Sequence, residues 1–131
     1  MKYVTTTGKR KSAIARATLS QGNGTIRINS RLLQCYEPEM HQLKIKEPLL
    51  IAGDTANKVD INVNVHGGGV RSQTEAIRLA IGKALANHDK KLTTIFADYD
   101  RQLLVADVRR KEPRKPNCHG KARAKRQTSY R

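Results

Sequence analysis

Apolar side chains recur at regular spacing only in the first 107 of the 131 residues, and this limits where a core can form. From Val108 onward the periodicity stops, and Pro113 and Pro116 interrupt any helix. Such a segment cannot offset its own ordering entropy by burying apolar surface. We therefore expect one globular α+β domain over residues 1–107 and an extended basic C-terminal tail over residues 108–131, disordered when the protein is free.

Two segments of the globular part show the alternation of β-strands. Residues 12–19 and 25–29 alternate between apolar and polar side chains, and Gly22-Asn23-Gly24 between them is a strong turn signal. This pattern predicts a β-hairpin. Residues 59–65 form the clearest strand, and its polar face is uncharged apart from Asp60, which suggests that this face is only half solvated.

Three helices are predicted between and after these strands. Residues 38–52 are helix-like, although Pro48 can kink or split that helix. Ser72-Gln73-Thr74-Glu75 reads as a capping box that opens a second helix ending near Asn87. A short third helix follows over residues 91–97. The expected arrangement is a mixed sheet with its helices on one face.

Charge indicates the class of partner. The chain has 26 lysines and arginines against 11 aspartates and glutamates, a formal net charge of +15. The tail contains ten basic side chains and one acidic one, Glu112, so its formal net charge is +9. Such an excess calls for a polyanion. A membrane surface is disfavoured because there is no Trp, one Phe and no apolar run that approaches a membrane span, so nucleic acid is favoured.

Enzyme signatures fail. Gly82-Lys83 and Gly120-Lys121 lack the upstream glycine and the following hydroxyl of a phosphate-binding P-loop, and the four histidines show no metal-ligand spacing. We expect no enzyme activity, no cofactor and no metal. Cys35 and Cys118 are far apart and fit free thiols in a reducing cytoplasm, and the N-terminus shows no secretory signal.

Three local features are candidate anion-binding sites. The basic cluster Lys9-Arg10-Lys11 lies at a predicted bend, where three cations cannot all face protein. Arg71 and Arg78 lie near the start of a helix, where the helix dipole disfavours cations, which indicates an external anion. Residues 67–69, three glycines between a strand and a helix, are suited either to a phosphate contact or simply to a tight backbone connection.

Three segments together resemble one known family, the ninth protein of the small ribosomal subunit (the universal S-nine family), in its archaeal form. They are Gly8-Lys9-Arg10-Lys11-Ser12-Ala13, residues 67–85, and the ending with Lys125-Arg126-Gln127 and Ser129-Tyr130-Arg131. The resemblance implies a split β-α-β fold like the second domain of ribosomal protein S-five, with a mixed four-stranded sheet. It also implies a place in the head of the small subunit, against rRNA and neighbouring head proteins.

The resemblance and the charge pattern together name the candidate binding residues. Those expected to bind rRNA are Lys9, Arg10, Lys11, Arg16, Arg71, Arg109, Arg110, Lys111, Arg114, Lys115, Lys121 and Arg123. The family's tail reaches the anticodon stem-loop of P-site tRNA, and this role carries over to Lys125, Arg126, Ser129, Tyr130 and Arg131. The rival interpretation is an extraribosomal nucleic-acid chaperone or compaction protein, which would be abundant outside ribosomal particles. A kinase-like enzyme of related fold is a more distant third.

Overall fold

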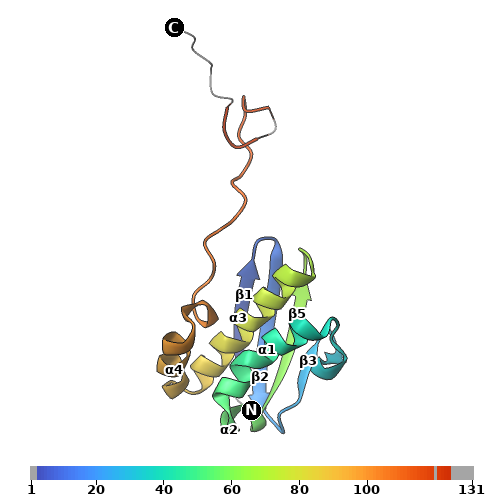
Figure 1. Ribbon diagram of the computed structural model, residues 1–131, viewed down its shortest axis with the longest axis vertical. Helices are drawn as coiled ribbons and strands as arrows, with labels where there is room; N and C mark the ends of the chain where they lie inside the picture. The colour runs from blue at the N-terminus through green and yellow to red at the C-terminus, as the bar shows by residue number, and fades with distance from the viewer. Residues whose placement is uncertain (1–2, 120, 125–131) are drawn as a thin grey trace.

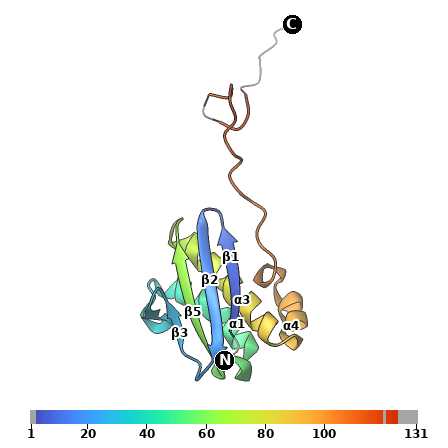
Figure 2. The same cartoon turned by 180° about the vertical axis from the view of Figure 1, so that it is seen from behind.

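The computed structural model describes residues 3–119 and 121–124. It has the expected α+β architecture, with helices α1 (Glu39–Ala52) and α3 (Val70–His88) packed on one face of a mixed sheet (Figure 1). Seen from behind, the other face of the sheet has no helix in front of it (Figure 2).

The sheet has five strands where we expected four. In spatial order they are β1 (Val4–Arg10), β2 (Ala13–Gln21), β5 (Val59–His66), β3 (Ile26–Ile28) and β4 (Arg31–Leu32). β3 and β5 are parallel, and the other neighbours are antiparallel. The additional strand is β4, which has only two residues and leaves no alternation in the sequence.

The predicted hairpin between residues 12–19 and 25–29 is wrong, because β5 inserts between β2 and β3. All four apolar side chains of β5, from Val59 to Val65, are buried, and a central position gives them neighbours on both sides. The segment with Gly22, Asn23 and Gly24 is therefore a crossover between separated strands. The sheet instead has two hairpins: one joins β1 to β2 at Lys11 and Ser12, within the basic bend, and the other joins β3 to β4 at Asn29 and Ser30.

The remaining helical elements are α2 (Asp54–Asn57), α4 (Lys91–Tyr99), and the 3-10 turns η1 (Leu33–Cys35) and η2 (Arg101–Leu103). Helix α1 continues past Pro48 without splitting, and the side chain of Pro48 is buried. The predicted capping box is wrong: α3 starts two residues before Ser72, with Gly69 as its N-cap and no side-chain cap. The carboxylate of Glu75 instead pairs with Arg10.

Small residues bring α3 close to the sheet. Ala76, Ala80 and Ala84 are fully buried on the helix. Opposite them lies Gly8 of β1, where a Cβ would stand only 2.1 Å from the carbonyl oxygen of Ala76. The hydroxyl of Thr6 donates to the carbonyl oxygen of Ala80 over 2.8 Å. Strand β1 and helix α3 therefore pack backbone against backbone.

The chain leaves the domain after η2. No helix or strand follows within the described residues 104–119 and 121–124, and the segment extends far from the domain (Figure 1).

Candidate nucleic-acid interface

The basic bend divides its cations between the two faces of the sheet. Lys9 shares the open face with Thr5 and Thr7, because side chains alternate along β1. Lys11 is exposed in the turn, with a positive φ of 53°. Arg10 points to the helix face and is held by protein carboxylates. Lys9 and Lys11 are therefore the two cations of the bend that are turned toward solvent.

The open face of the sheet extends this basic surface. Arg16 of β2 is exposed and lies in register between Thr7 and Asn64. Arg27 of β3 is exposed beside Asn62. Hydroxyl and amide groups thus surround the arginines, which together offer hydrogen-bond donors over several strands. We call Lys9, Lys11, Arg16 and Arg27 the basic sheet face.

The described strands carry one carboxylate, that of Asp60, and it is turned to the backbone. Its Oδ1 accepts hydrogen bonds from the amides of Asn23 (2.9 Å) and Thr25 (2.8 Å). The hydrogen bond from Thr25, followed by that from Asn23, holds the pKa of Asp60 below its ordinary value. The carboxylate of Asp60 thus stabilises the crossover before β3 through its hydrogen bonds to the backbone. The net charge of the basic sheet face remains positive.

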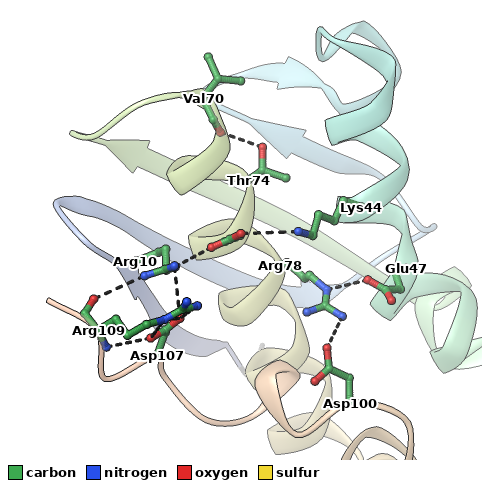
Figure 3. A network of polar contacts seen from close by, with 10 residues as sticks. Arg10, Lys44, Glu47, Val70, Thr74, Arg78, Asp100, Asp107 and Arg109 are labelled. Carbon is green, nitrogen blue, oxygen red and sulfur yellow. Dashed lines mark hydrogen bonds and ion pairs between the residues drawn. The ribbon is translucent and has the colours of Figure 1, made fainter.

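Arg10 fixes the base of the tail (Figure 3). Its Nε lies 2.6 Å from a carboxylate oxygen of Glu75, and its Nη2 lies 3.4 Å from Asp107. Its Nη1 also donates to the carbonyl oxygen of Arg109 over 3.4 Å. The guanidinium of Arg109 also forms an ion pair with Asp107, at 2.7 Å. These contacts join β1, α3 and the first residues of the tail.

A second network, around the buried side chain of Arg78, contradicts the expectation of an external anion at this residue. The Nε of Arg78 lies 2.6 Å from Glu47 of α1, and its Nη2 lies 2.8 Å from Asp100 (Figure 3). The two carboxylates compensate the cation inside the protein. By contrast, Arg71 is exposed and makes no ion pair within the described residues, so its predicted role in rRNA binding stays a prediction.

The described tail presents its cations to solvent. Glu112 forms ion pairs with Lys115 (3.0 Å) and Arg123 (3.1 Å), and these pairs fold this part of the tail back on itself. Four further exposed cations have no carboxylate partner in the part of the chain that the structure describes; they are Arg110, Lys111, Arg114 and Lys121. The candidate tRNA-binding residues Lys125, Arg126, Ser129, Tyr130 and Arg131 lie outside the described residues.

The glycine run before α3 has a clear backbone reason. Gly67 and Gly68 have φ values of 74° and 66°, in the left-handed region that favours glycine. A Cβ on Gly67 would also stand 2.6 Å from the carbonyl oxygen of Ser12. The tight connection therefore accounts for these two glycines, and a phosphate contact at residues 67–69 stays a prediction.

Sequence reasoning did not single out Arg27 as a binding residue. The signals available were the alternation of residues 25–29, which turns Arg27 away from the core, and the uncharged polar face of β5, which marks a face that is not fully solvated. Elsewhere, the described residues contain no cluster of three potential metal ligands. Nor does any helix among them have the length and apolar character needed to span a membrane.

Comparison with known proteins places this geometry in a family. A family model described as ribosomal protein S9/S16 matches residues 8–131. Small ribosomal subunit protein uS9 of Methanococcus maripaludis strain C7 is 48% identical over 134 residues, which cover the whole of both chains. The uS9 protein of Methanococcus vannielii shows the same identity over the same length.

Proposed function

Because the chain belongs to the ribosomal protein S9/S16 family, and is therefore a structural constituent of the small ribosomal subunit, we propose that it binds small-subunit rRNA through two separate surfaces. One is the basic sheet face, and the other is the row of tail cations from Arg109 to Arg123. The family membership also makes it a component of the cytoplasmic translation machinery and not an enzyme.

The observation that carries this proposal is the set of cations without protein partners. Carboxylates inside the protein compensate Arg10 and Arg78. The cations of the basic sheet face make no ion pair within the described residues, and neither do Arg110, Lys111, Arg114 and Lys121. Phosphates supply the missing anions, and binding releases the counterions that otherwise screen them.

Arg10 has a different part in this proposal. Its side chain is only 12% exposed and touches Glu75 and Asp107. We assign it to holding the base of the tail, so that residues 1–107 bind as one domain while residues 108–131 follow the rRNA away from it. Arg71, exposed at the start of α3, adds a further phosphate contact.

The finer function of the tail tip rests on the family resemblance. We propose that Lys125, Arg126, Ser129, Tyr130 and Arg131 contact the anticodon stem-loop of the tRNA in the P site. Arginine at such a tip suits this task, because its planar guanidinium can bind a phosphate in bidentate fashion and stack on a base.

One experiment with two variants tests both parts. Neutralising Lys9, Lys11 and Arg16 to Gln should weaken binding to naked small-subunit rRNA and lower its log-log salt slope by roughly 2–3. Removing residues 129–131 should leave that affinity unchanged and weaken P-site tRNA binding to subunits that carry the variant. The matched control neutralises Lys58, Lys90 and Lys91, which are exposed elsewhere. Equal losses in control and test variant would refute the basic sheet face, and unchanged tRNA affinity would refute the tip.

A further inference from the structure

Large apolar side chains are exposed together on two packed helices. On α1, Met40 is 78%, Leu43 57% and Leu50 77% exposed. On α4, Ile95 and Tyr99 are 47% and 59% exposed. Single exposed apolar residues are ordinary, but a contiguous group of them marks an interaction surface.

One hydrogen bond shows that these side chains form a single surface. Glu47 lies one turn from both Leu43 and Leu50 on α1. The hydroxyl of Tyr99 on α4 donates to Glu47 over 2.8 Å, and Ile95 lies one turn before Tyr99. The other carboxylate oxygen of Glu47 binds Arg78, so its charge is already compensated. We call Met40, Leu43, Leu50, Ile95 and Tyr99 the α1–α4 face.

The lysines of α1 lie at the two edges of this face, because Lys44 is one turn from Met40 and Lys46 is one turn from Leu43 and Leu50. Lys44 reaches toward Glu75 of α3, at 3.6 Å. Lys46 lines a hollow together with Leu32 and Gln34. Lys91, one turn before Ile95, is a further cation near the margin.

Acids without partners flank the face. Four carboxylates neither form an ion pair nor accept a hydrogen bond within the described residues; they are Glu37, Glu39, Asp54 and Asp98. Glu39 precedes Met40, Asp54 starts the turn after Leu50, and Asp98 precedes Tyr99. In a chain of net charge +15, three of the four unpaired acids therefore adjoin one apolar surface, while Glu37 lines a hollow beside Asn29 and Val65.

We propose that the α1–α4 face docks a neighbouring protein of the small subunit, through an apolar surface on that protein with lysines or arginines at its margin. The partner's side chains would exclude water from the apolar centre, and Glu39, Asp54 and Asp98 would pair with its cations. RNA fits poorly, because the same acids would repel its phosphates. The sheet face and tail would meet RNA, and this helix face would meet protein.

The first test separates protein docking from RNA binding. Leu43 and Leu50 are changed together to Gln, and the control changes Leu32 and Val70 to Gln, which are also exposed but lie elsewhere. Because all four side chains are exposed, every variant should melt at the temperature of the parent protein. The test variant should bind naked small-subunit rRNA with unchanged affinity, yet be retained on the order of tenfold less well in subunits reconstituted with all their proteins.

The second measurement identifies the class of partner directly. A photo-reactive amino acid replaces Met40, and assembled subunits are irradiated. We expect an adduct with a different protein, at a peptide with apolar side chains beside Lys or Arg. An adduct with RNA or with a second copy of this chain would overturn the proposal, as would no adduct. A fall in rRNA affinity of the Leu43 and Leu50 variant, or its normal retention in subunits, would do the same.

Discussion

Arg78 is the one charged residue that is buried among residues 3–119 and 121–124. Burial alone would lower its pKa, but the hydrogen bonds that its guanidinium donates to Glu47 and Asp100 outweigh this and raise the pKa above its ordinary value. The guanidinium ties α1, α3 and the start of η2 at one point.

Replacing Arg78 with Met should destabilise the fold by about 1–3 kcal/mol, because two partly exposed carboxylates would lose their cation. Arg78→Lys keeps the charge but cannot reach both carboxylates with a planar fork, so we expect a smaller loss. Chemical denaturation of both variants measures the difference. If Arg78→Met unfolds at the denaturant concentration of the parent, the network contributes nothing to stability.

Gly8 sets the distance between β1 and α3. Gly8→Ala places a Cβ 2.1 Å from the carbonyl oxygen of Ala76 and 2.8 Å from the amide nitrogen of Ala80, so the helix must move. We expect a loss of about 2–3 kcal/mol in the free energy of unfolding. The matched control is Gly69→Ala, where no atom lies within 4 Å and the cost should stay below about 1 kcal/mol. Equal thermal shifts in the two variants would contradict this packing.

At the scale of elements, the sequence predicted what local pattern determines. The strand at residues 59–65 and the alanine-lined helix before Asn87 are confirmed, because each shows its period without help from distant residues. Which strands pair was not predictable from the turn at residues 22–24. The partner of β2 is set by the burial of β5, which lies about forty residues further along the chain.

The same limit applies to single charges. Arg10 and Arg78 both look in the sequence like cations that require an external anion, and their carboxylates lie 22 to 97 residues away. The position of Ser72 three residues before Glu75 predicts a capping box. The structure instead pairs Glu75 with Arg10, 65 residues away. Lys9 and Arg16 lie on the open face of the sheet, as alternation along their strands predicts, while their role in rRNA binding stays a prediction.

The contact between Arg10 and Glu75 predicts how the packing of β1 on α3 depends on pH. Burial favours the neutral carboxyl of Glu75, but the hydrogen bond from Arg10 and the charges of Lys44 and Arg10 lower its pKa below the ordinary 4.5. The unfolded chain titrates at the ordinary value. The contribution of Glu75 to stability is therefore complete above a pH of about 5 and is lost as the pH falls through the lowered pKa of the folded state.

Glu75→Gln should consequently be less stable than the parent near neutral pH, with a gap that narrows as the pH falls below about 5 and through the lowered pKa of the folded state. Asp100 and Asp107 also have lowered pKa values and remain in the variant, so some acid sensitivity persists. Urea denaturation at a series of pH values measures the two curves. Parallel curves across this range would show that Glu75 titrates alike in both states.

For the whole molecule, charge is sorted into regions with different partners. The open sheet face and the tail carry cations without carboxylate partners, while the helix layer holds most of the acids, several of them in ion pairs. A domain of this charge would repel itself without a polyanion, so the cations outside the helix layer contribute to binding and not to folding. Their removal should therefore not lower the melting temperature of the free protein.

The tail gives the sharpest test of this division. Changing Arg110, Lys111, Arg114 and Lys121 together to Gln should lower the log-log salt slope of rRNA binding by about 3, because each phosphate contact contributes roughly 0.7–0.9. The charge-matched control neutralises Lys46, Lys58, Lys90 and Lys91 of the domain. Both proteins have the same net charge, so a general electrostatic attraction predicts equal slopes. A larger loss for the tail variant, with an unchanged melting temperature, is expected only if these four cations lie along the phosphates.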